Sequence, residues 1–386
     1  MATEITLSLC LIVRNEEETL GHCLDSIRDL VDEIILVDTG STDRTKEIGQ
    51  KYTDKIFDFA WVDDFAQARN FSFSQATQDY ILWLDADDIL AAPDREKFAV
   101  LKKTLDPSTD VVNMPYLLAF DQFGQVSFSL RRNRLVKRSR NFRWVGAVHE
   151  YLEVGGRILN SDICVTHKGK PERDSARNLR IFESRLARGE EFSPRDLYYY
   201  ANELYEQKLF NRAVEFYQKF LATDQGWVED RIAACGRLAD CFQSLNEKDK
   251  ALQSLFKSFA YDVPRAEACC RLGHQFLQTG NYAQAVFWYK LATQLKVPDG
   301  WGPRIEACWT WLPHLQLCVC YDRLGQYELA YAHNEIARTY RPEDPQVLHN
   351  KKYLEGVRPD SGKIPPLPPY GPEFGTGEDI LTKEQR

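Results

Sequence analysis

The sequence predicts an α/β domain with a mostly parallel sheet, followed by an all-α superhelix of repeated helix pairs. Apolar segments of strand length alternate with helical segments up to residue 84, which is the pattern of right-handed β–α–β crossovers. Shorter apolar segments separated by turns follow between residues 111 and 166, and predict an antiparallel extension of the same sheet. The second half of the 386-residue chain repeats one helix–turn–helix pattern.

Hydrophobic periodicity places the elements of the α/β half. Continuous apolar runs such as EIILVD predict strands buried on both faces, and apolar residues three and four apart predict helices. The loop after residue 38 is not a GxGxxG and the chain has no GxxxxGK[ST], so neither a dinucleotide enzyme nor a P-loop enzyme is expected. We expect strands at residues 7–13, 33–38, 55–59 and 80–84, and helices over 16–31, from residue 43 and over 65–77.

Three carboxylates follow the strand expected at residues 80–84. Asp85, Asp87 and Asp88 would meet at the carboxyl end of that strand, where ligands bind in open parallel sheets. Carboxylates this close repel one another unless a cation lies among them, and oxygen ligands suit Mg²⁺ or Mn²⁺, which in turn suit a diphosphate. The alternative is that they cap the next helix or face water. A fourth acid, Asp38, ends the second strand and either binds a ribose or base or only starts the turn.

Composition and charge limit the classes of function. With a net charge of −8, the protein is not expected to be a general nucleic-acid binder. The ten cysteines form no CxxC pattern, which predicts reduced core residues of a cytoplasmic protein rather than disulfides or a zinc site. The apolar run at 7–13 lacks a basic leader, and no run approaches the roughly 20 residues of a membrane span. A basic cluster either forms a solvated face or meets phosphates or an acidic acceptor; its members are Arg131, Arg132, Arg134, Lys137, Arg138, Arg140 and Arg143.

Four segments of the second half share small residues at fixed offsets. The alanines that mark their second helices, residues 213, 251, 285 and 330, are 38, 34 and 45 residues apart. The tetratricopeptide period is about 34 residues, so the pattern predicts tetratricopeptide repeats, some of them with insertions. Such stacks present a concave groove that binds peptides or proteins. Oligomerisation, or bracing of the first domain, is the alternative.

These patterns divide the chain into four parts. Residues 1–175 form the α/β domain, 176–193 a charged helical connector, and 194–356 the repeats. Residues 357–386 are rich in proline and glycine, a composition that cannot form a packed core and that predicts an extended tail.

A series of short motifs runs in a fixed order through the first half. Together they resemble the family 2 glycosyltransferases of the GT-A fold over about residues 5–170. The series is most similar to the sublancin-type peptide S-glycosyltransferases and also resembles the lipooligosaccharide core glucosyltransferases. The motifs are Ser8-Leu-Cys-Leu-Ile-Val-Arg-Asn-Glu-Glu, Ile-Leu-Val-Asp38-Thr-Gly-Ser-Thr-Asp43, Asp63-Asp64-Phe-Ala-Gln-Ala-Arg69-Asn70, Leu84-Asp85-Ala-Asp87-Asp88, Arg134-Leu-Val-Lys, Gly146-Ala-Val-His149-Glu150 and Val165-Thr-His167-Lys-Gly169.

The resemblance implies an inverting transfer of a sugar from a nucleotide-diphosphate sugar, such as a UDP-sugar. Asp87 would bind the divalent cation, Mn²⁺ or Mg²⁺, with His167 and Asp85 as further ligands. The other role for His167 is contact with the diphosphate, and the other role for Asp85 is contact with the ribose. Arg69 would lie near the phosphates, where a guanidinium pairs well with oxygens. The resemblance implies a nucleotide-sugar pocket formed by Val13, Arg14, Asn15, Asp38, Asp64, Arg69 and Asp85.

The acceptor must lose a proton on the face of the sugar opposite the leaving group, which requires a general base. His149 and Glu150 can both accept a proton, but in a strand the two would point to opposite faces. We favour Glu150, with His149 as the second candidate and Asp88 as the third. The family often places its base in an acidic pair further along the chain, and this sequence departs from that pattern.

The sequence therefore predicts a metal-assisted inverting hexosyltransferase whose acceptor is a Cys or Ser side chain of a peptide or protein held by the repeats. One alternative keeps the chemistry but makes the acceptor a saccharide or lipooligosaccharide core. Another is a repeat scaffold with an inactive transferase domain, and the intact set of Asp38, Asp85 and Asp87 argues against it. No nucleic-acid partner and no transmembrane segment are expected, and the repeats are compatible with a homo-oligomer.

Overall fold

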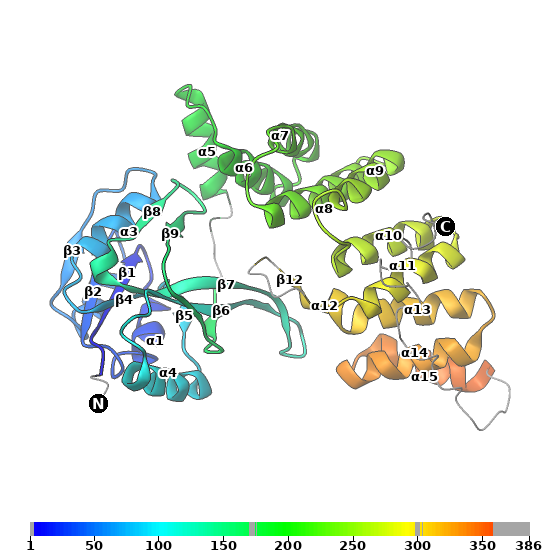
Figure 1. Cartoon of the computed structure of the whole chain (residues 1–386), viewed down its shortest axis with the longest axis horizontal. Coiled ribbons are helices and arrows are strands. Elements are labelled where there is room, and N and C mark those ends of the chain that lie inside the picture. Colours follow the sequence, from blue (N-terminus) through cyan, green and yellow to red (C-terminus); the bar gives the residue numbers. More distant parts are fainter. Residues whose placement is uncertain (1–3, 170–173, 175, 298–301, 303, 358–386) are drawn as a thin grey trace, which may run out of the picture. The chain divides into compact units, whose positions relative to one another are not determined.

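The computed structural model describes residues 4–169, 174, 176–297, 302 and 304–357. The chain divides into two compact units. The first holds residues 1–226 with a short segment at 301–304, and the second holds residues 227–300 and 305–386. Most strands of the first unit and most helices of both units are labelled in Figure 1.

A mixed sheet is the centre of the first unit. Its main strands are β1 (Leu7–Val13), β2 (Glu33–Asp38), β3 (Ile56–Asp58), β4 (Tyr80–Trp83), β5 (Asp88–Ile89), β6 (Val111–Phe120), β7 (Val126–Lys137), β10 (Ile158–Asn160) and β11 (Val165–His167). The order is β3-β2-β1-β4-β7-β6-β11-β5, with β10 beside β6. The first four strands are parallel, whereas β7 is antiparallel to both β4 and β6. The predicted parallel half with an antiparallel extension is therefore confirmed.

Helices cover both faces of this sheet. Along β1, Leu9 and Leu11 face one hydrophobic cluster and Cys10 faces another, as the two-residue period of a strand requires. The first cluster includes residues of α1 and α4, and the second includes Ala66 of α3. The helices are α1 (Leu20–Asp25), α2 (Thr45–Gly49), α3 (Phe65–Ser74) and α4 (Ala92–Thr104).

The helix predicted over 16–31 is shorter in the structure. Helix α1 ends at Asp25, and the chain continues in turns to Leu30. Ser26 ends the regular ladder because its backbone N–H reaches both the His22 and Cys23 carbonyls and its hydroxyl donates to the Cys23 carbonyl at 2.7 Å. The apolar spacing still places Ile27 in the core with no exposed surface. The burial pattern was predicted correctly, but the local hydrogen bonding was not.

Three helices complete the first unit: α5 (Arg177–Ala187), α6 (Pro194–Glu206) and α7 (Phe210–Ala222). The predicted connector thus contains a helix, α5. Ser193 and Asp196 form a capping box at the start of α6, where Pro194 occupies the first turn. The first helix pair of the repeat region therefore lies in the same compact unit as the sheet, together with a small two-stranded sheet of β8 (Arg143–Val145) and β9 (Tyr151–Glu153).

The second unit is built of helix pairs. Its helices are α8 (Val228–Ser244), α9 (Lys248–Ser258), α10 (Ala266–Gln278), α11 (Tyr282–Gln294), α12 (Glu306–Trp309), α13 (Trp311–Arg323), α14 (Tyr327–Tyr340) and α15 (Pro345–Val357). The alanines used to predict the repeats, at 213, 251, 285 and 330, lie in α7, α9, α11 and α14 and have no exposed surface. Small residues there let paired helices approach closely, which confirms the repeat prediction. The predicted tail lies outside the described residues.

Two further expectations concern cysteines and membranes. All ten cysteines are free, and only Cys164 is not buried. Within the described part of the chain, none of the helices is both long and apolar enough to cross a membrane.

Candidate active site

The three acids after β4 occupy different environments. The Asp85 side chain is 33% exposed and that of Asp87 is 20% exposed, whereas Asp88 has no exposed surface. Asp88 opens β5, whose antiparallel partner β11 brings His167 opposite it. The pairing of β5 with β11 therefore brings His167, about eighty residues further along the chain, next to the three acids.

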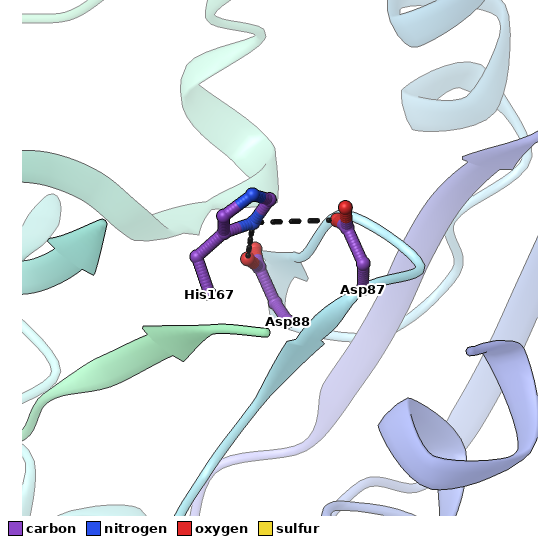
Figure 2. Close-up of side chains that lie close together, drawn as sticks. All are labelled: Asp87, Asp88 and His167. Atoms are coloured by element: carbon purple, nitrogen blue, oxygen red, sulfur yellow. Dashed lines mark ion pairs between the residues drawn. The ribbon is translucent and has the colours of Figure 1, made fainter. Parts of the chain in front are cut away.

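Asp87, Asp88 and His167 form the one group in the described residues with the arrangement of a metal site. The Nδ1 atom of His167 lies 3.5 Å from an oxygen of Asp87 and 3.5 Å from an oxygen of Asp88, as Figure 2 shows. Two carboxylates and an imidazole are a donor set that accepts Mn²⁺ or Mg²⁺. The sequence predicted Asp85 with Asp87 and His167; the structure groups Asp88 with these two and pairs Asp85 with Arg69.

Asp88 also has strong partners inside the protein. It forms a fully buried ion pair with Arg134 at 3.0 Å, and it accepts hydrogen bonds from the Tyr116 hydroxyl at 2.7 Å and the Asp85 amide at 3.0 Å. The Tyr116 hydroxyl is also 3.1 Å from Nδ1 of His167. Such outer contacts orient metal-binding side chains. Asp88 was the third candidate for the general base. Its burial argues against that role, because the sugar-accepting molecule cannot reach its carboxylate.

The electrostatics of the group favour a cation. Burial raises the pKa of Asp87 to about 6, and the neighbouring Asp85 and Asp88 carboxylates act in the same direction while His167 opposes them. The pKa of His167 is raised by its contact with Asp88 and by the charge of Asp87, against the effect of burial. The negative charges of the Asp85, Asp87 and Asp88 carboxylates are thus more than His167 alone can neutralise.

Arg69 connects Asp85 to Glu150, the residue that the sequence favoured as general base. Its Nε donates to Glu150 at 2.5 Å and its Nη2 donates to Asp85 at 2.6 Å, and its guanidinium carbon lies 4.9 Å from the ring centroids of both Trp83 and Trp144. Burial acts to raise the pKa of Asp85, but the charge of Arg69 outweighs it and lowers that pKa to about 2. The structure therefore groups Arg69, Asp85 and Glu150.

Helix α3 positions Arg69. Asp64 is its N-cap, and its carboxylate accepts a hydrogen bond from the Gln67 amide at 3.0 Å. Asn70 on the same helix exchanges hydrogen bonds of 2.9 Å with the backbone of Trp144. Asp64, predicted in the nucleotide pocket, thus has an evident role in starting the helix that carries Arg69.

The remaining predicted residues meet at the carboxyl ends of β1 and β2, where Val13 pairs with Asp38. Asp38 is 1% exposed and accepts hydrogen bonds from the Gly40 and Ser41 amides at 3.2 and 3.0 Å. Asn15 has a φ of 55° and its side chain accepts a hydrogen bond from the Thr42 amide at 2.8 Å. These contacts hold the loop after β2 against the end of β1. Arg14 is exposed beside this loop.

The His149-Glu150 segment is held from outside the sheet. His149 has a φ of 52°, which is uncommon for a residue with a side chain and costs on the order of 1–3 kcal/mol. Its Nε2 lies 2.6 Å from Glu203 on α6, and its ring stacks on Tyr199 at 4.4 Å. Arg195 donates to its carbonyl at 2.8 Å. Sequence reasoning missed these α6 residues, because nothing in the repeat pattern links residue 203 to residue 149.

Residues 8–150 match the model of glycosyl transferase family 2, and residues 266–296 match that of a tetratricopeptide repeat. One part of the chain thus matches the family 2 glycosyl transferases and another matches a tetratricopeptide repeat, so the resemblance predicted from the motifs is confirmed.

Curated relatives match over part of their lengths. A TPR repeat-containing protein of Synechococcus elongatus is 40% identical over 38% of this chain and 35% of that protein. The SPbeta prophage-derived glycosyltransferase SunS of Bacillus subtilis is 28% identical over 55% of this chain and 53% of that protein. The lipopolysaccharide core biosynthesis glycosyltransferase LpsC of Rhizobium meliloti is 29% identical over 42% of this chain and 62% of that protein. The chain therefore spans between about a third and three fifths of these relatives.

Proposed function

We propose that the protein transfers a sugar, with inversion, from a nucleotide-diphosphate sugar to an acceptor, and that a divalent cation assists. The observation that carries this proposal is the grouping of Asp87 and His167 at the end of β4, beside the buried Asp88. Asp87 and His167 would hold Mn²⁺ or Mg²⁺. Such a cation, when bound, offsets the negative charge that develops on the leaving diphosphate.

The nucleotide would lie over the ends of β1 and β2. This region is lined by Val13, Asn15 and Asp38. The buried Asp38 carboxylate is fixed by the hydrogen bonds that it accepts from the loop amides. Because Asp38 is almost fully buried, it would act by holding the loop that the nucleotide meets. Asp85 would lie between the ribose and the cation. Its hydrogen bond and ion pair with Arg69 keep its carboxyl group ionised.

The family 2 match and the relatives SunS and LpsC support the transfer reaction, and of the two names only that of LpsC gives a class of acceptor. We favour a peptide or protein acceptor, with a Cys or Ser side chain as nucleophile. The repeats support this choice, since stacked helix pairs offer extended surfaces for polypeptides. An exposed aromatic cluster on α9 and α11, with Phe256 at 45% and Phe287 at 52% exposure beside Trp288, adds to that support. A lipopolysaccharide core acceptor is the second candidate, because LpsC carries that name.

The basic cluster at 131–143 does not favour one acceptor over another. Arg131 donates to Asn113 and to the Ser161 carbonyl, and Arg134 pairs with Asp88. Arg138 donates to the Gln78 carbonyl. These guanidinium groups therefore stabilise the domain rather than form a free cationic surface.

The raised pKa of Asp87 predicts how cation affinity depends on pH. A proton occupies Asp87 below pH 6 or so, because its pKa is about 6, and the raised pKa of His167 adds in the same direction. Mn²⁺ affinity should therefore fall steadily as the pH drops from 7 to 5, because Asp87 and His167 must both lose their protons to bind the metal. Calorimetric titration of Mn²⁺ at pH 5, 6 and 7 measures this. Equal affinity at pH 5 and pH 7 would contradict the assignment of Asp87.

A shortened chain tests the role of the repeats. A chain ending at Gly226 keeps the first unit, including α6, apart from the short segment at 301–304. We expect it to hydrolyse the donor at close to the full-length rate but to lose transfer to peptide, as measured by nucleotide release and by mass spectrometry of a library of Cys- and Ser-containing peptides. Transfer at the full-length rate would place acceptor recognition in the first unit.

A further inference from the structure

We infer that Glu203, on the first helix of the repeat region, is a positioning residue that prepares His149 to accept the acceptor's proton through Nδ1. This inference rests on the proposed transfer reaction and deepens it. It also reverses the order of Glu150 and His149 that the sequence favoured.

Glu150 is poorly placed to take a proton. Its side chain is 11% exposed, and the Nε–H of Arg69 donates to its Oε1 at 2.5 Å. Arg69 is itself buried and also holds Asp85. Protonation of Glu150 would remove the charge that this buried guanidinium pairs with, which is costly in a site of low exposure. Glu150 therefore serves better as a fixed anion that orients Arg69.

His149 has the complementary properties. Its side chain is 33% exposed, and Nε2 lies 2.6 Å from the Glu203 carboxylate, which is itself buried. An ionised carboxylate only accepts hydrogen bonds, so the neutral imidazole must carry its proton on Nε2, and Nδ1 then presents a lone pair. Across the described residues, none is recorded as a hydrogen-bond partner of that Nδ1. Glu203 also accepts from Asn178 on α5 at 3.1 Å, which fixes the carboxylate in turn.

Helix α6 holds the backbone of His149 as well as its ring. Arg195 donates to the His149 carbonyl and lies over the rings of Tyr151 and Tyr199, while Tyr199 stacks on the imidazole. The left-handed backbone at His149 persists only because its surroundings impose it. Three contacts from one helix thus determine the orientation of a residue that adjoins the Arg69 group in sequence.

In the reaction, a lone pair of the acceptor sulfur or oxygen forms the bond to the anomeric carbon. The bond between that carbon and the diphosphate oxygen breaks, and its electron pair leaves with the nucleoside diphosphate. The acceptor's proton moves to Nδ1 of His149, and the resulting imidazolium is stabilised by Glu203. Loss of the proton to solvent restores the neutral ring.

Nitrogen-15 NMR of histidine-labelled full-length protein tests the tautomer without any acceptor. Comparison with His149→Gln identifies the signal. We expect the neutral form of His149 to carry its proton on Nε2. A proton on Nδ1 would overturn the inference, because that nitrogen would then have no lone pair for the acceptor.

Kinetics test the role, with the full-length protein, Mn²⁺ and the first of UDP-glucose, UDP-galactose and UDP-N-acetylglucosamine that the wild type hydrolyses. We expect His149→Ala to lose roughly 100-fold or more in kcat with little change in KM, and to regain activity with added imidazole. Glu203→Gln should lose kcat by a smaller factor. Glu215→Gln, in an exposed ion pair with Lys219 on α7, is the matched control and should retain wild-type rates.

The outcomes separate the inference from the proposed function. Calorimetric binding of UDP with Mn²⁺ should persist in His149→Ala and Glu203→Gln, which shows that the variants fold. If the wild type binds neither UDP nor GDP and hydrolyses none of the three donors, the proposed function fails, and the tautomer alone then decides the state of His149. If the wild type is active but Glu203→Gln behaves like Glu215→Gln, or imidazole does not restore His149→Ala, the inference is overturned.

Discussion

Replacing Asp87 by asparagine will abolish metal-dependent hydrolysis of the nucleotide-sugar while leaving the domain folded. Asp87 is the partly exposed carboxylate of the Asp87, Asp88 and His167 group, so it is the member that an incoming diphosphate and cation can share. A bound cation is worth several kcal/mol of charge stabilisation in the transition state, and each 1.4 kcal/mol is a factor of ten. The expected loss is therefore roughly 100-fold to 1,000-fold in kcat/KM, measured by release of nucleoside diphosphate.

The control for this variant is Asp54→Asn, which makes the same chemical change at an exposed position before β3. It should retain wild-type turnover and Mn²⁺ dependence. Circular dichroism and thermal unfolding of both variants report whether the fold persists. Turnover of Asp87→Asn at the rate of Asp54→Asn would contradict the assignment of the cation to this group.

Of the substitutions proposed here, Arg134→Met should cause the largest loss in the free energy of unfolding. Arg134 and Asp88 have no exposed surface, and the guanidinium lies against the rings of Trp83 and Tyr116, with its central carbon 4.0 and 4.3 Å from their centroids. Removing one partner of such a pair leaves the other charge buried without compensation, which costs about 3–5 kcal/mol. Urea unfolding followed by tryptophan fluorescence measures the loss in the first unit, where Trp83 lies.

Arg28→Met is the comparison for that measurement. Arg28 pairs with Asp25 at 3.7 Å, and both side chains are well over half exposed. Exposed pairs contribute about 0–1 kcal/mol, so this variant should unfold close to the wild-type urea concentration. If Arg134→Met and Arg28→Met unfold at the same urea concentration, the buried pair does not stabilise the domain as we argue.

The sequence predicted the framework well because the signals there are local. The apolar runs that became β1, β2 and β4 have few alternatives to a buried parallel sheet, and their polar ends necessarily meet at one edge. For the same reason Asp38, Asp85 and Asp87 could be expected at the carboxyl ends of their strands. The alanines of the repeats predicted the helix pairs, because the close contact between paired helices requires a small residue at the same position of each repeat.

What could not be predicted depends on pairing between distant elements. The grouping of Asp88 with Asp87 and His167 follows from the two-residue strand β5, which is too short to show periodicity. Arg134 was counted among surface cations because only the sheet shows that it points at Asp88. Glu203 belongs to a helix whose pattern describes its own packing, so its contact with His149 appears only once α6 is placed beside the sheet.

The central claim is that the end of β4 binds a nucleoside diphosphate through a divalent cation. Calorimetric titration of UDP and GDP into the full-length protein, with Mn²⁺ and with the cation removed by chelation, tests it most directly. We predict saturable binding of one of the two with Mn²⁺, and loss of that binding both on chelation and in Asp87→Asn. Binding of equal strength without the cation, or binding that Asp87→Asn leaves unchanged, would contradict the account.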